Sequence, residues 1–279
     1  MEKNGMKNQR IRMTRYEMTI PAGKPASIAL VSDLHNIPCG PVIRLLSEVR
    51  PDYIAVNGDI LCAAPGGKSI YHADEGSSQH IRNAADARRF LEESRKMAPV
   101  LFSTGNHELY FDREDRDWLK EHGILFLDND YMVSDGLVFG GLSSPYPVLA
   151  GTGDASSEEE HRARWALIYD SVQTAWLDRF EKTPGFKILL SHHPEFYDRF
   201  LKERRGINLI LAGHTHGGQI RFFGRGLYAY GQGWFPAYSK GCYDNRMIVS
   251  AGLANTSRIP RLNNPPELVV IQLVPGRRA

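Results

Sequence analysis

The chain has 279 residues, of which 42% are hydrophobic and 24% are charged, and its formal net charge is +2. This length allows one large α/β domain or two small ones with a substantial core, and the near-neutral charge argues against a dedicated nucleic-acid binder. The three cysteines, Cys39, Cys62 and Cys242, are scattered and lack Cys-x-x-Cys spacing, so they favour a reducing, cytoplasmic compartment over a disulfide framework or a zinc knuckle.

Residues 1–15 are basic, and we expect them to form a flexible N-terminus ahead of a single domain over residues 16–279. No apolar stretch typical of a signal peptide follows them, and the sequence contains no run of 18 apolar residues. The sequence therefore predicts no transmembrane segment. A contact of the basic residues with a membrane surface is the weaker interpretation, because no amphipathic or lipidated partner accompanies them.

Apolar strands alternate with helical patterns over much of the chain. Residues 27–33 form an apolar run that predicts a strand buried on both faces, and residues 41–49 carry the apolar stripe of a helix. Further strands are predicted at residues 53–57, 100–103, 186–190 and 209–212, and further helices at residues 81–96 and 113–122. This alternation predicts strands whose carboxyl ends meet at a common edge.

Four other segments complete the prediction. Residues 62–80 form a long loop after the second strand, and such a loop often covers a site. Asp135-Gly136, between two alternating stretches, predicts a hairpin. A helix capped near Ser156 or Ser157 is predicted to run to about residue 181, and residues 221–279 are predicted to be rich in strands.

The predicted strands end in side chains that suit metal binding. They are Asp33 and His35, then Asp59, then Asn106 and His107, then His192 and His193, and finally His214 and His216. Residues two apart in extended backbone project to the same side, so His214 and His216 would point together, as would Asp33 and His35. Imidazole and carboxylate groups are common ligands of divalent metals. The sequence therefore predicts a metal site along the carboxyl ends of the strands.

Five motifs, in chain order, match a known signature. They are Asp33-x-His35, Gly58-Asp59, Gly105-Asn106-His107-Glu108, His192 and Gly213-His214-Thr215-His216. Over about residues 27–220 the chain resembles the calcineurin-like metallophosphoesterase superfamily, and residues 258–268 resemble the closing segment of its YkuE-like bacterial branch. The resemblance implies an α/β fold, a four-layer α/β/β/α sandwich of two mixed β-sheets flanked by helices.

The resemblance also implies a role for each matching residue. Asp59 would bridge two divalent ions, and His107 would protonate the leaving oxygen or stabilise charge on the phosphoryl oxygens. The other ligands would be Asp33, His35 and His216 for one ion and Asn106, His192 and His214 for the other. Their oxygen and nitrogen donors suit Mn, Fe or Zn. The alternative interpretations are that Asp59 caps the following segment and that Asn106 is a turn residue.

The function implied by the resemblance is dinuclear metal-dependent hydrolysis of a phosphoester by a metal-activated hydroxide. A small-molecule phosphodiester is the favoured substrate, because the YkuE-like branch includes phosphodiesterases. A phosphomonoester or a pyrophosphate bond, in a nucleotide or a lipid-linked compound, is the alternative. A metal-binding scaffold without turnover is an alternative of another class, and the near-neutral charge disfavours a nuclease.

Residues outside the five motifs are candidates for contacts with the substrate. His193 either contacts the substrate or supports a ligand. Residues 222–243 are dense in aromatic side chains, which form either a wall of the site or part of the core, and Trp234 and Tyr238 are the most site-like of them. Arg221 is a candidate for phosphate binding. Glu108 is expected to orient His107 or a ligand, and Cys62 is interpreted as a small buried hydrophobe.

Overall fold

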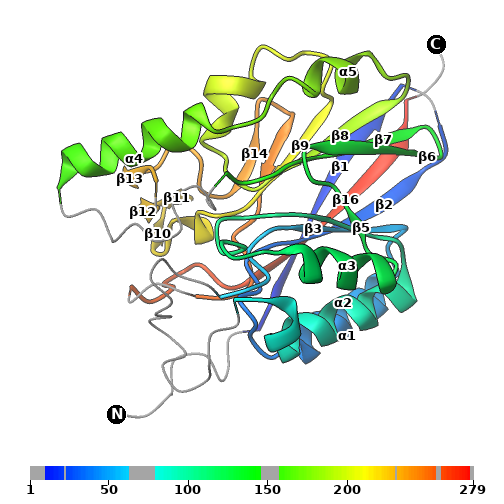
Figure 1. Ribbon diagram of the computed structural model, residues 1–279, viewed down its shortest axis with the longest axis horizontal. Coiled ribbons are helices and arrows are strands. Elements are labelled where there is room, and N and C mark those ends of the chain that lie inside the picture. The colour runs from blue at the N-terminus through cyan, green and yellow to red at the C-terminus, as the bar shows by residue number, and fades with distance from the viewer. Residues whose placement is uncertain are drawn as a thin grey trace.

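Two six-stranded β-sheets pack face to face, and helices cover the outer face of each (Figure 1). The computed structural model describes residues 10–21, 23–62, 79–145, 157–229, 231–255 and 259–276. Helices α1, α2 and α3 lie on one outer face and α5 on the other, while α4 projects from the second side toward the end of the molecule (Figure 1). The α/β/β/α sandwich predicted from the sequence is therefore confirmed.

The first sheet has the order β1-β16-β2-β3-β4-β5. Its strands are β1 (Arg12–Ile20), β16 (Glu267–Pro275), β2 (Ala26–Val31), β3 (Tyr53–Asn57), β4 (Val100–Ser103) and β5 (Leu125–Phe126). Strands β2 to β5 are parallel, whereas β16 is antiparallel to β2 and parallel to β1. The carboxyl ends of β2, β3 and β4 consequently lie at one edge.

The second sheet has the order β14-β15-β9-β8-β7-β6. Its strands are β14 (Gly241–Tyr243), β15 (Met247–Val249), β9 (Leu209–Ala212), β8 (Phe186–Ser191), β7 (Leu137–Leu142) and β6 (Asp130–Ser134). Strands β6 and β7 form the hairpin predicted at Asp135-Gly136, where both residues have positive φ, 50° and 79°. Strands β7, β8, β9 and β15 are parallel, so β8 and β9 also end at a common edge.

Three hydrophobic cores hold the four layers together. The helices are α1 (Gly40–Val49), α2 (Ala85–Met97), α3 (Arg113–Glu121), α4 (Glu158–Asp170) and α5 (Leu177–Lys182), with a π-helical turn at Tyr197–Leu201. One core lies between the first sheet and α1 to α3, one between the two sheets, and one between the second sheet and its helices. Strands buried on both faces are continuous apolar runs, which explains why the sequence located them.

The first strand begins earlier than expected. Residues 12–15 were expected to belong to a flexible N-terminus, but they are the start of β1 and pair in parallel register with residues 267–270 of β16. The expectation was wrong for these residues because the pairing partner lies at the other end of the chain, so nothing in the local sequence indicates it. Residues 1–9 lie outside the described part of the chain.

The long helix predicted from about residue 156 to residue 181 is divided into α4 and α5. Ser157 caps α4 by accepting a hydrogen bond from the backbone N–H of Glu160, as the sequence indicated. Helix α4 ends at Asp170, and the hydroxyl of the next residue, Ser171, donates to the carbonyl of Leu167. Such a bond back to the preceding turn, followed by β-branched Val172, weakens the helix here. Trp165 and Phe180 are nevertheless both buried, in the core under the second sheet's helices.

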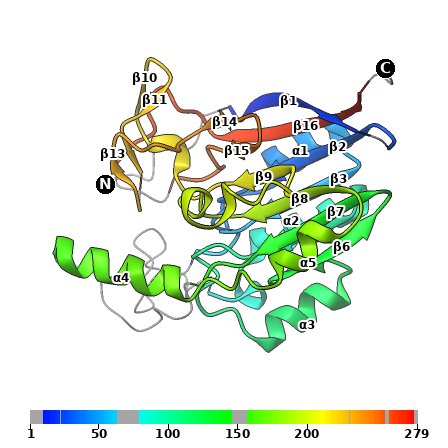
Figure 2. The same cartoon turned by 90° about the horizontal axis from the view of Figure 1, so that it is seen from above.

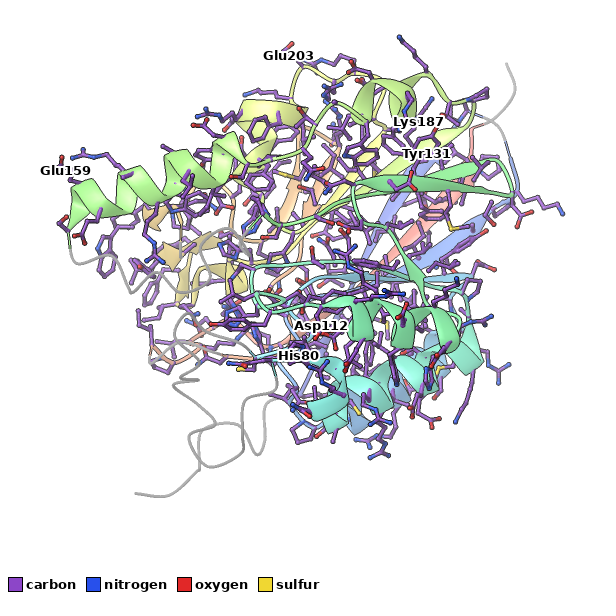
Figure 3. The ribbon with its side chains drawn as sticks, in the orientation of Figure 1. His80, Asp112, Tyr131, Glu159, Lys187 and Glu203 are labelled. Atoms are coloured by element: carbon purple, nitrogen blue, oxygen red, sulfur yellow. The ribbon has the colours of Figure 1, made fainter. Side chains whose placement is uncertain are left out.

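The segment before α2 is tied to α3. His80 Nδ1 lies 2.8 Å from Asp115 Oδ2 and 3.4 Å from Asp112 Oδ2 (Figure 3). A single 3₁₀ turn, Ile81–Asn83, precedes α2, so the helix expected from residue 81 starts at Ala85. Residues 63–78 of the loop expected to cover the site lie outside the described residues.

Two small hairpins follow the second sheet's strand β9. They consist of β10 (Arg221–Phe222) with β11 (Arg225–Gly226), and β12 (Tyr228–Ala229) with β13 (Gly233–Trp234). They lie at the same end of the molecule as the N-terminal end of α4 (Figure 1). Within the described ranges, no helix is both long and apolar enough to span a bilayer.

Candidate metal centre

The residues that the sequence marked as ligands come together where the two sheets end. Asp33 and His35 follow β2, Asp59 follows β3, His192 follows β8, and His214 and His216 follow β9. All six side chains are buried, the most accessible being His216 at 7%. The site therefore lies between the sheets, and each sheet supplies part of it.

The backbone at these residues is locally strained. Positive φ values occur at Asp33 (56°), His35 (46°), Asp59 (54°), His214 (67°) and His216 (47°). Residues other than glycine rarely adopt this left-handed conformation, which costs about 1–2 kcal/mol per residue. Strain at five ligand positions indicates that the positions of the side chains, rather than chain propensity, determine this local geometry.

Two groups of donor atoms meet at Asp59. Asp33, His35 and His216 form one group and Asp59, His192 and His214 the other, each with its ligand atoms within 4.8 Å of one another. Asp59 Oδ2 lies 3.1 Å from His192 Nε2 in its own group and 3.7 Å from His35 Nε2 in the other. The Asp59 carboxylate thus occupies the position between the two groups that a bridging ligand requires.

Backbone carbonyls lie against the Nδ1 atoms of three histidines at the centre. His35 Nδ1 lies 3.1 Å from the carbonyl of Leu61, His192 Nδ1 lies 2.7 Å from that of Asn57, and His216 Nδ1 lies 3.0 Å from that of Ala254. A carbonyl only accepts hydrogen bonds, so Nδ1 carries a proton in His35 and His192, whereas Nδ1 of His216 also lies 3.2 Å from Arg261 Nη2, which is a donor. In His35, Nε2 is left to face the centre with its lone pair, as metal-ligating histidines require, and in His192 it faces Asp59 Oδ2 at 3.1 Å.

The polar atoms of the centre fit divalent cations. His35 Nε2 and Asn106 Oδ1 are buried, and neither has a hydrogen-bond partner among the residues that the structure describes. Burial lowers the pKa of His35, His214 and His216, which keeps these rings neutral and able to coordinate. Nitrogen and oxygen donors in two such groups suit borderline and hard divalent metals.

His192 differs from the other rings. Its burial disfavours the charged form, but the neighbouring Asp59 carboxylate outweighs burial and raises the pKa of His192 to about 10. In the protein without metal, the positive charge of protonated His192 therefore balances the negative charge of Asp59. A bound cation would take the place of this proton.

Glu108 holds the loop that carries Asp59. Its buried carboxylate accepts backbone N–H groups from Asp59 (2.8 Å), Ile60 (2.9 Å), Leu61 (3.1 Å) and Gly105 (2.7 Å). It consequently joins the loop after β3 to the loop after β4. The sequence suggested an orienting role, and the structure extends it to the backbone of both loops.

The same two loops approach too closely for side chains. A Cβ atom on Gly105 would lie 2.3 Å from Asp59 Oδ1, and one on Gly58, where φ is 77°, would lie 2.4 Å from the backbone nitrogen of Gly105. Glycine at both positions is therefore required for Asp59 to reach the centre.

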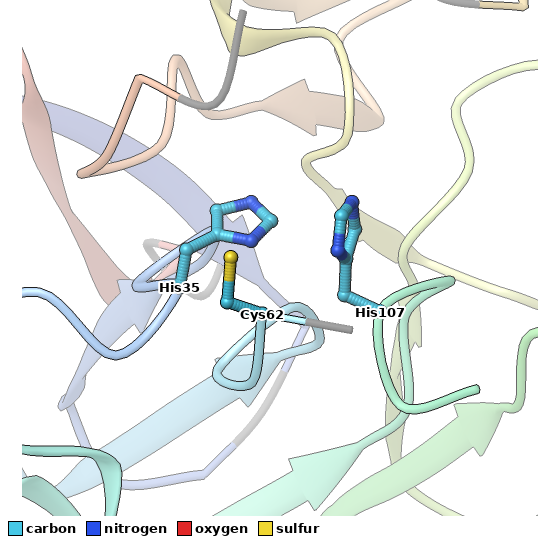
Figure 4. A group of neighbouring side chains, drawn as sticks. All are labelled: His35, Cys62 and His107. Carbon is cyan, nitrogen blue, oxygen red and sulfur yellow. The ribbon is translucent and has the colours of Figure 1, made fainter. Parts of the chain in front are cut away.

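His107 lies at the accessible side of the centre. It is half-buried, its backbone N–H donates to Asp59 Oδ1 at 2.8 Å, and its ring stands edge-on to His35 with centroids 4.5 Å apart. The thiol of Cys62 lies with these two rings in a third group of potential ligands (Figure 4). Cys62 is buried, as expected, but it also adjoins the centre.

The substrate candidates are placed differently from one another. His193 adjoins the centre, with its ring centroid 4.5 Å from that of His214 and Nε2 2.8 Å from Ser144 Oγ. Tyr238 is partly buried and packs against the core beneath the second sheet's helices, and its hydroxyl donates to Asp198 at 3.0 Å. Trp234 is exposed on β13, with its ring 5.5 Å from that of Tyr228.

Arg221 does not direct its guanidinium at the centre. Nη1 donates to the carbonyl of Gly217 at 2.8 Å and to Ser239 Oγ at 3.1 Å, and Nη2 donates to the carbonyl of Gly224. The arginine therefore braces the turn after His216.

Two residues at the centre were not singled out from the sequence. Arg261 is buried, and its Nη2 donates to the carbonyl of Ala254, which also accepts from His216; burial lowers the pKa of Arg261 to about 10. Glu195 lies in a group with His193 and His214, and burial raises its pKa to about 7. A lone arginine in a loop carries no signal, whereas Glu195 could have been noticed beside His192-His193.

The chain is similar to several known proteins. The family model described as calcineurin-like phosphoesterase matches residues 26–218. An uncharacterized protein of Bacillus subtilis (strain 168), YpbG, is 26% identical over 274 residues, covering 96% of this chain and 88% of its own length. An uncharacterized metallophosphoesterase of Aquifex aeolicus (strain VF5) is 25% identical over 273 residues, covering 94% and 92%. A crystal structure of a dimetal phosphatase from Danio rerio has 14% identity and a TM-score of 0.48, covering 81% of this chain and 87% of its own.

The family match covers more than half of the chain and contains every proposed ligand, from Asp33 to His216. The resemblance seen in the sequence is therefore confirmed at the level of the superfamily. Members of this family use a dinuclear centre of divalent metals, and the candidate ligand groups for one are present. The chain belongs to the calcineurin-like phosphoesterase family and is a metal-dependent phosphoester hydrolase.

Proposed function

We propose that the protein is a phosphodiesterase and that Asp59 bridges its two metal ions. The other ligands in this proposal are Asp33, His35 and His216 for one ion, and Asn106, His192 and His214 for the other. The single observation that supports this arrangement most strongly is the position of Asp59 Oδ2, 3.1 Å from His192 Nε2 in one ligand group and 3.7 Å from His35 Nε2 in the other.

The bound cations would supply Lewis-acid charge on the phosphoryl oxygens and a water molecule of lowered pKa. The protein supplies the rest. Glu108 holds the loops that carry Asp59 and His107, and backbone carbonyls hold the histidine rings at fixed angles. His107 is accessible at the edge of the centre, where it would donate a proton to the departing oxygen or stabilise charge on the phosphoryl group.

Charge balance supports a diester over a monoester. A diester phosphoryl group carries one negative charge at neutral pH, whereas a monoester carries close to two. Arg221 and Arg261, the arginines that flank the His216 turn, donate to backbone carbonyls. Both guanidinium groups keep their positive charge, but that of Arg221 is directed at Gly217, Ser239 and Gly224, so it offers no donors to the second negative charge of a monoester, and this favours the less charged substrate. The resemblance to the YkuE-like branch points in the same direction.

Two candidates are retained for contacts with the substrate. His193 adjoins the second ligand group, with a ring centroid 5.1 Å from that of His192, so it would contact the phosphoryl group or its ester substituent. Trp234 is exposed on the hairpin after His216 and would contact only a bulky substituent. Manganese, iron and zinc are all compatible with the donor set, and we use manganese for the test.

The test compares two chromogenic esters. Metal-stripped protein receives Mn²⁺, and hydrolysis of bis(p-nitrophenyl) phosphate is measured against p-nitrophenyl phosphate, with His107→Ala as the control for contaminating activity. We expect faster turnover of the diester that depends on both Mn²⁺ and His107. Faster turnover of the monoester would overturn the diester assignment and leave the hydrolase assignment standing. No turnover of either ester, with two metals bound, would favour a selective pyrophosphatase or a non-catalytic scaffold.

A further inference from the structure

The two small hairpins are hydrogen-bonded to the turn that contains His216. The backbone N–H of Leu227 donates to the carbonyls of Gly218 (3.1 Å) and Ile220 (2.8 Å), and that of Phe235 donates to the carbonyl of Leu227 (2.8 Å). The hairpins lie together at one end of the molecule in both views (Figure 1, Figure 2). Anything that binds them is therefore held beside the metal centre.

Large apolar side chains are exposed on these hairpins. The residues are Phe222 (53% exposed), Phe223 (105%), Trp234 (65%), Phe235 (73%) and, on the strand-like bridge beside β10, Leu262 (50%). We call these five residues the hairpin face. Among the described residues, only three other large hydrophobic side chains are exposed to a similar degree. Apolar side chains gathered in this way mark a contact surface, whereas isolated ones do not.

The turn between β10 and β11 is an unfavourable place for phenylalanine. Phe223 and Gly224 are its two central residues, with φ values of 49° and 80°, and Phe222 pairs with Arg225 across it. Such a turn favours Asn-Gly, because bulky residues resist positive φ. Phe235 is also left-handed, at 54°. The fold does not account for either phenylalanine, so an external contact is the better explanation.

The charge around the hairpin face is positive. Residues 213–243 contain no aspartate or glutamate but include Arg221, Arg225 and Lys240, in a chain whose net charge is only +2. A cavity of about 630 Å³ opens beside Phe222 and Phe223 and is lined by Arg12, Arg221 and Lys240. Lys240 is paired with buried Glu267 at 2.7 Å. The net charge of the cavity lining is therefore positive because of Arg12 and Arg221.

We propose that the hairpin face binds the surface of a membrane that contains anionic lipids. The aromatic tips would enter the interface between headgroups and acyl chains, where Trp and Phe are favoured, and the exposed Arg12 and Arg225 would contact lipid phosphates. A second copy of the chain fits less well, because a symmetric contact would bring the arginines of the two copies together, and the segment 213–243 has no acidic residue to pair with them. The inference concerns where the protein acts and does not depend on which phosphoester it hydrolyses.

Sedimentation with lipid vesicles tests the proposal. Vesicles of phosphatidylcholine with and without phosphatidylglycerol are compared for the full chain and for the double variant Phe223→Asn, Phe235→Asn. Asparagine tolerates positive φ, so the variant should keep or raise the Tm. We expect the wild-type chain to sediment with the anionic vesicles. The double variant should lose at least about tenfold in partition coefficient, because it lacks two aromatic side chains that would be buried in the bilayer. Its kcat for a soluble ester should not change.

A matched control and a charge variant sharpen the result. Val133→Asn removes a similarly exposed side chain (55%) from β6, away from the hairpins, and should bind vesicles as the wild type does. Arg225→Gln should weaken binding to anionic vesicles more than to neutral ones.

Three results would overturn the proposal. One is a wild-type chain that sediments with neither vesicle, and another is a double variant that binds as tightly as the wild type. The third is that the double variant loses self-association, or binding to a single-stranded oligonucleotide, while no vesicle binding is seen in the wild type. That third result would assign the hairpin face to a second copy or to a nucleic acid.

Discussion

Backbone carbonyls orient several of the proposed ligand histidines. Nδ1 of His35 and Nδ1 of His192 each lie against a carbonyl oxygen, so no proton has to move between their ring nitrogens before Nε2 binds a cation. Asp59 and His107 differ from these residues, because one is held between both ligand groups and the other lies at their accessible side. Substitution of these two residues should therefore have different consequences.

Asp59→Ala should lose both metals together with activity. The variant removes the carboxylate that lies between the two ligand groups and leaves His192 without its charge partner. Metal content per chain, measured by inductively coupled plasma mass spectrometry, checks this expectation. Asp130→Ala, at an exposed carboxylate on β6, is the matched control. Two metals retained by Asp59→Ala would contradict the bridging role.

His107→Ala should keep both metals while kcat falls by roughly 10²-fold or more, the size of effect typical of a positioned acid. The ring is near the ligands but half-exposed, so its removal leaves the buried donor atoms in place. Steady-state kinetics with metal analysis on the same sample separates the two effects. His122→Ala, on the exposed end of α3, provides the comparison, and an unchanged kcat in His107→Ala would exclude this role.

At the scale of the elements, the strands and the proposed ligands could be predicted from the sequence for the same reason. A strand buried on both faces is a continuous apolar run, and the first polar residues after it, such as Asp33 and His192, mark the edge of the sheet. The boundary between α4 and α5 was missed because apolar residues such as Trp165 and Phe180 keep a helical spacing across the break. A hydrophobic pattern does not report the Ser171 hydroxyl that bonds back to the preceding turn.

The loops between elements were harder to predict than the elements. The four backbone N–H groups gathered by Glu108 belong to two separate loops, and the exposure of Phe223 depends on a turn that its own sequence disfavours. Tyr238 and Trp234 come from one aromatic stretch, yet Tyr238 is partly buried against the core and Trp234 faces solvent. Contacts of this kind depend on tertiary geometry and leave no periodic signal.

Gly58→Ala and Gly136→Ala form a matched pair that isolates a loop contact. Both glycines have φ near 80°, so alanine costs about 1–2 kcal/mol at either position. A Cβ atom on Gly136 would meet nothing within 4 Å, whereas one on Gly58 would meet Gly105 and lie 2.8 Å from His192 Nδ1. Gly58→Ala alone should therefore lose metal and activity as well as stability.

Thermal unfolding and metal titration of both variants measure the difference. Equal losses of Tm and equal metal binding would show that only the backbone conformation matters, and that the close approach of the loops after β3 and β4 is not required for the centre.

At the scale of the whole molecule, the metal centre lies between the two sheets. Asp33, His35 and Asp59 come from the first sheet, and His192, His214 and His216 come from the second. Ions bound by these side chains would therefore connect the sheets at the edge where their strands end, in addition to the hydrophobic core between them.

Metal removal should lower the stability of the entire fold. A ligand that binds only the folded state adds about 2.7 kcal/mol when present at a hundred times its Kd, so chelation should lower the Tm by several degrees. Calorimetry before and after treatment with EDTA checks this, with Mn²⁺ restored as a reversal. Asp59→Ala should not respond to EDTA, and a wild-type Tm that does not change either would show that the ions contribute nothing to holding the sheets together.

The position of β16 has a consequence for synthesis on the ribosome. Strand β16 lies between β1 and β2, so the first two strands to be translated do not pair with each other but wait for Glu267–Pro275. Glu267 also accepts the backbone N–H of Ala251, beside the Gly252 turn that packs on Asp33. A nascent chain in which all seven proposed ligands have left the ribosome therefore still lacks the pairing partner of β1 and of one edge of β2. Strands β2 to β5 can pair before this, but cotranslational folding of the first sheet is completed only after β16 leaves the exit tunnel.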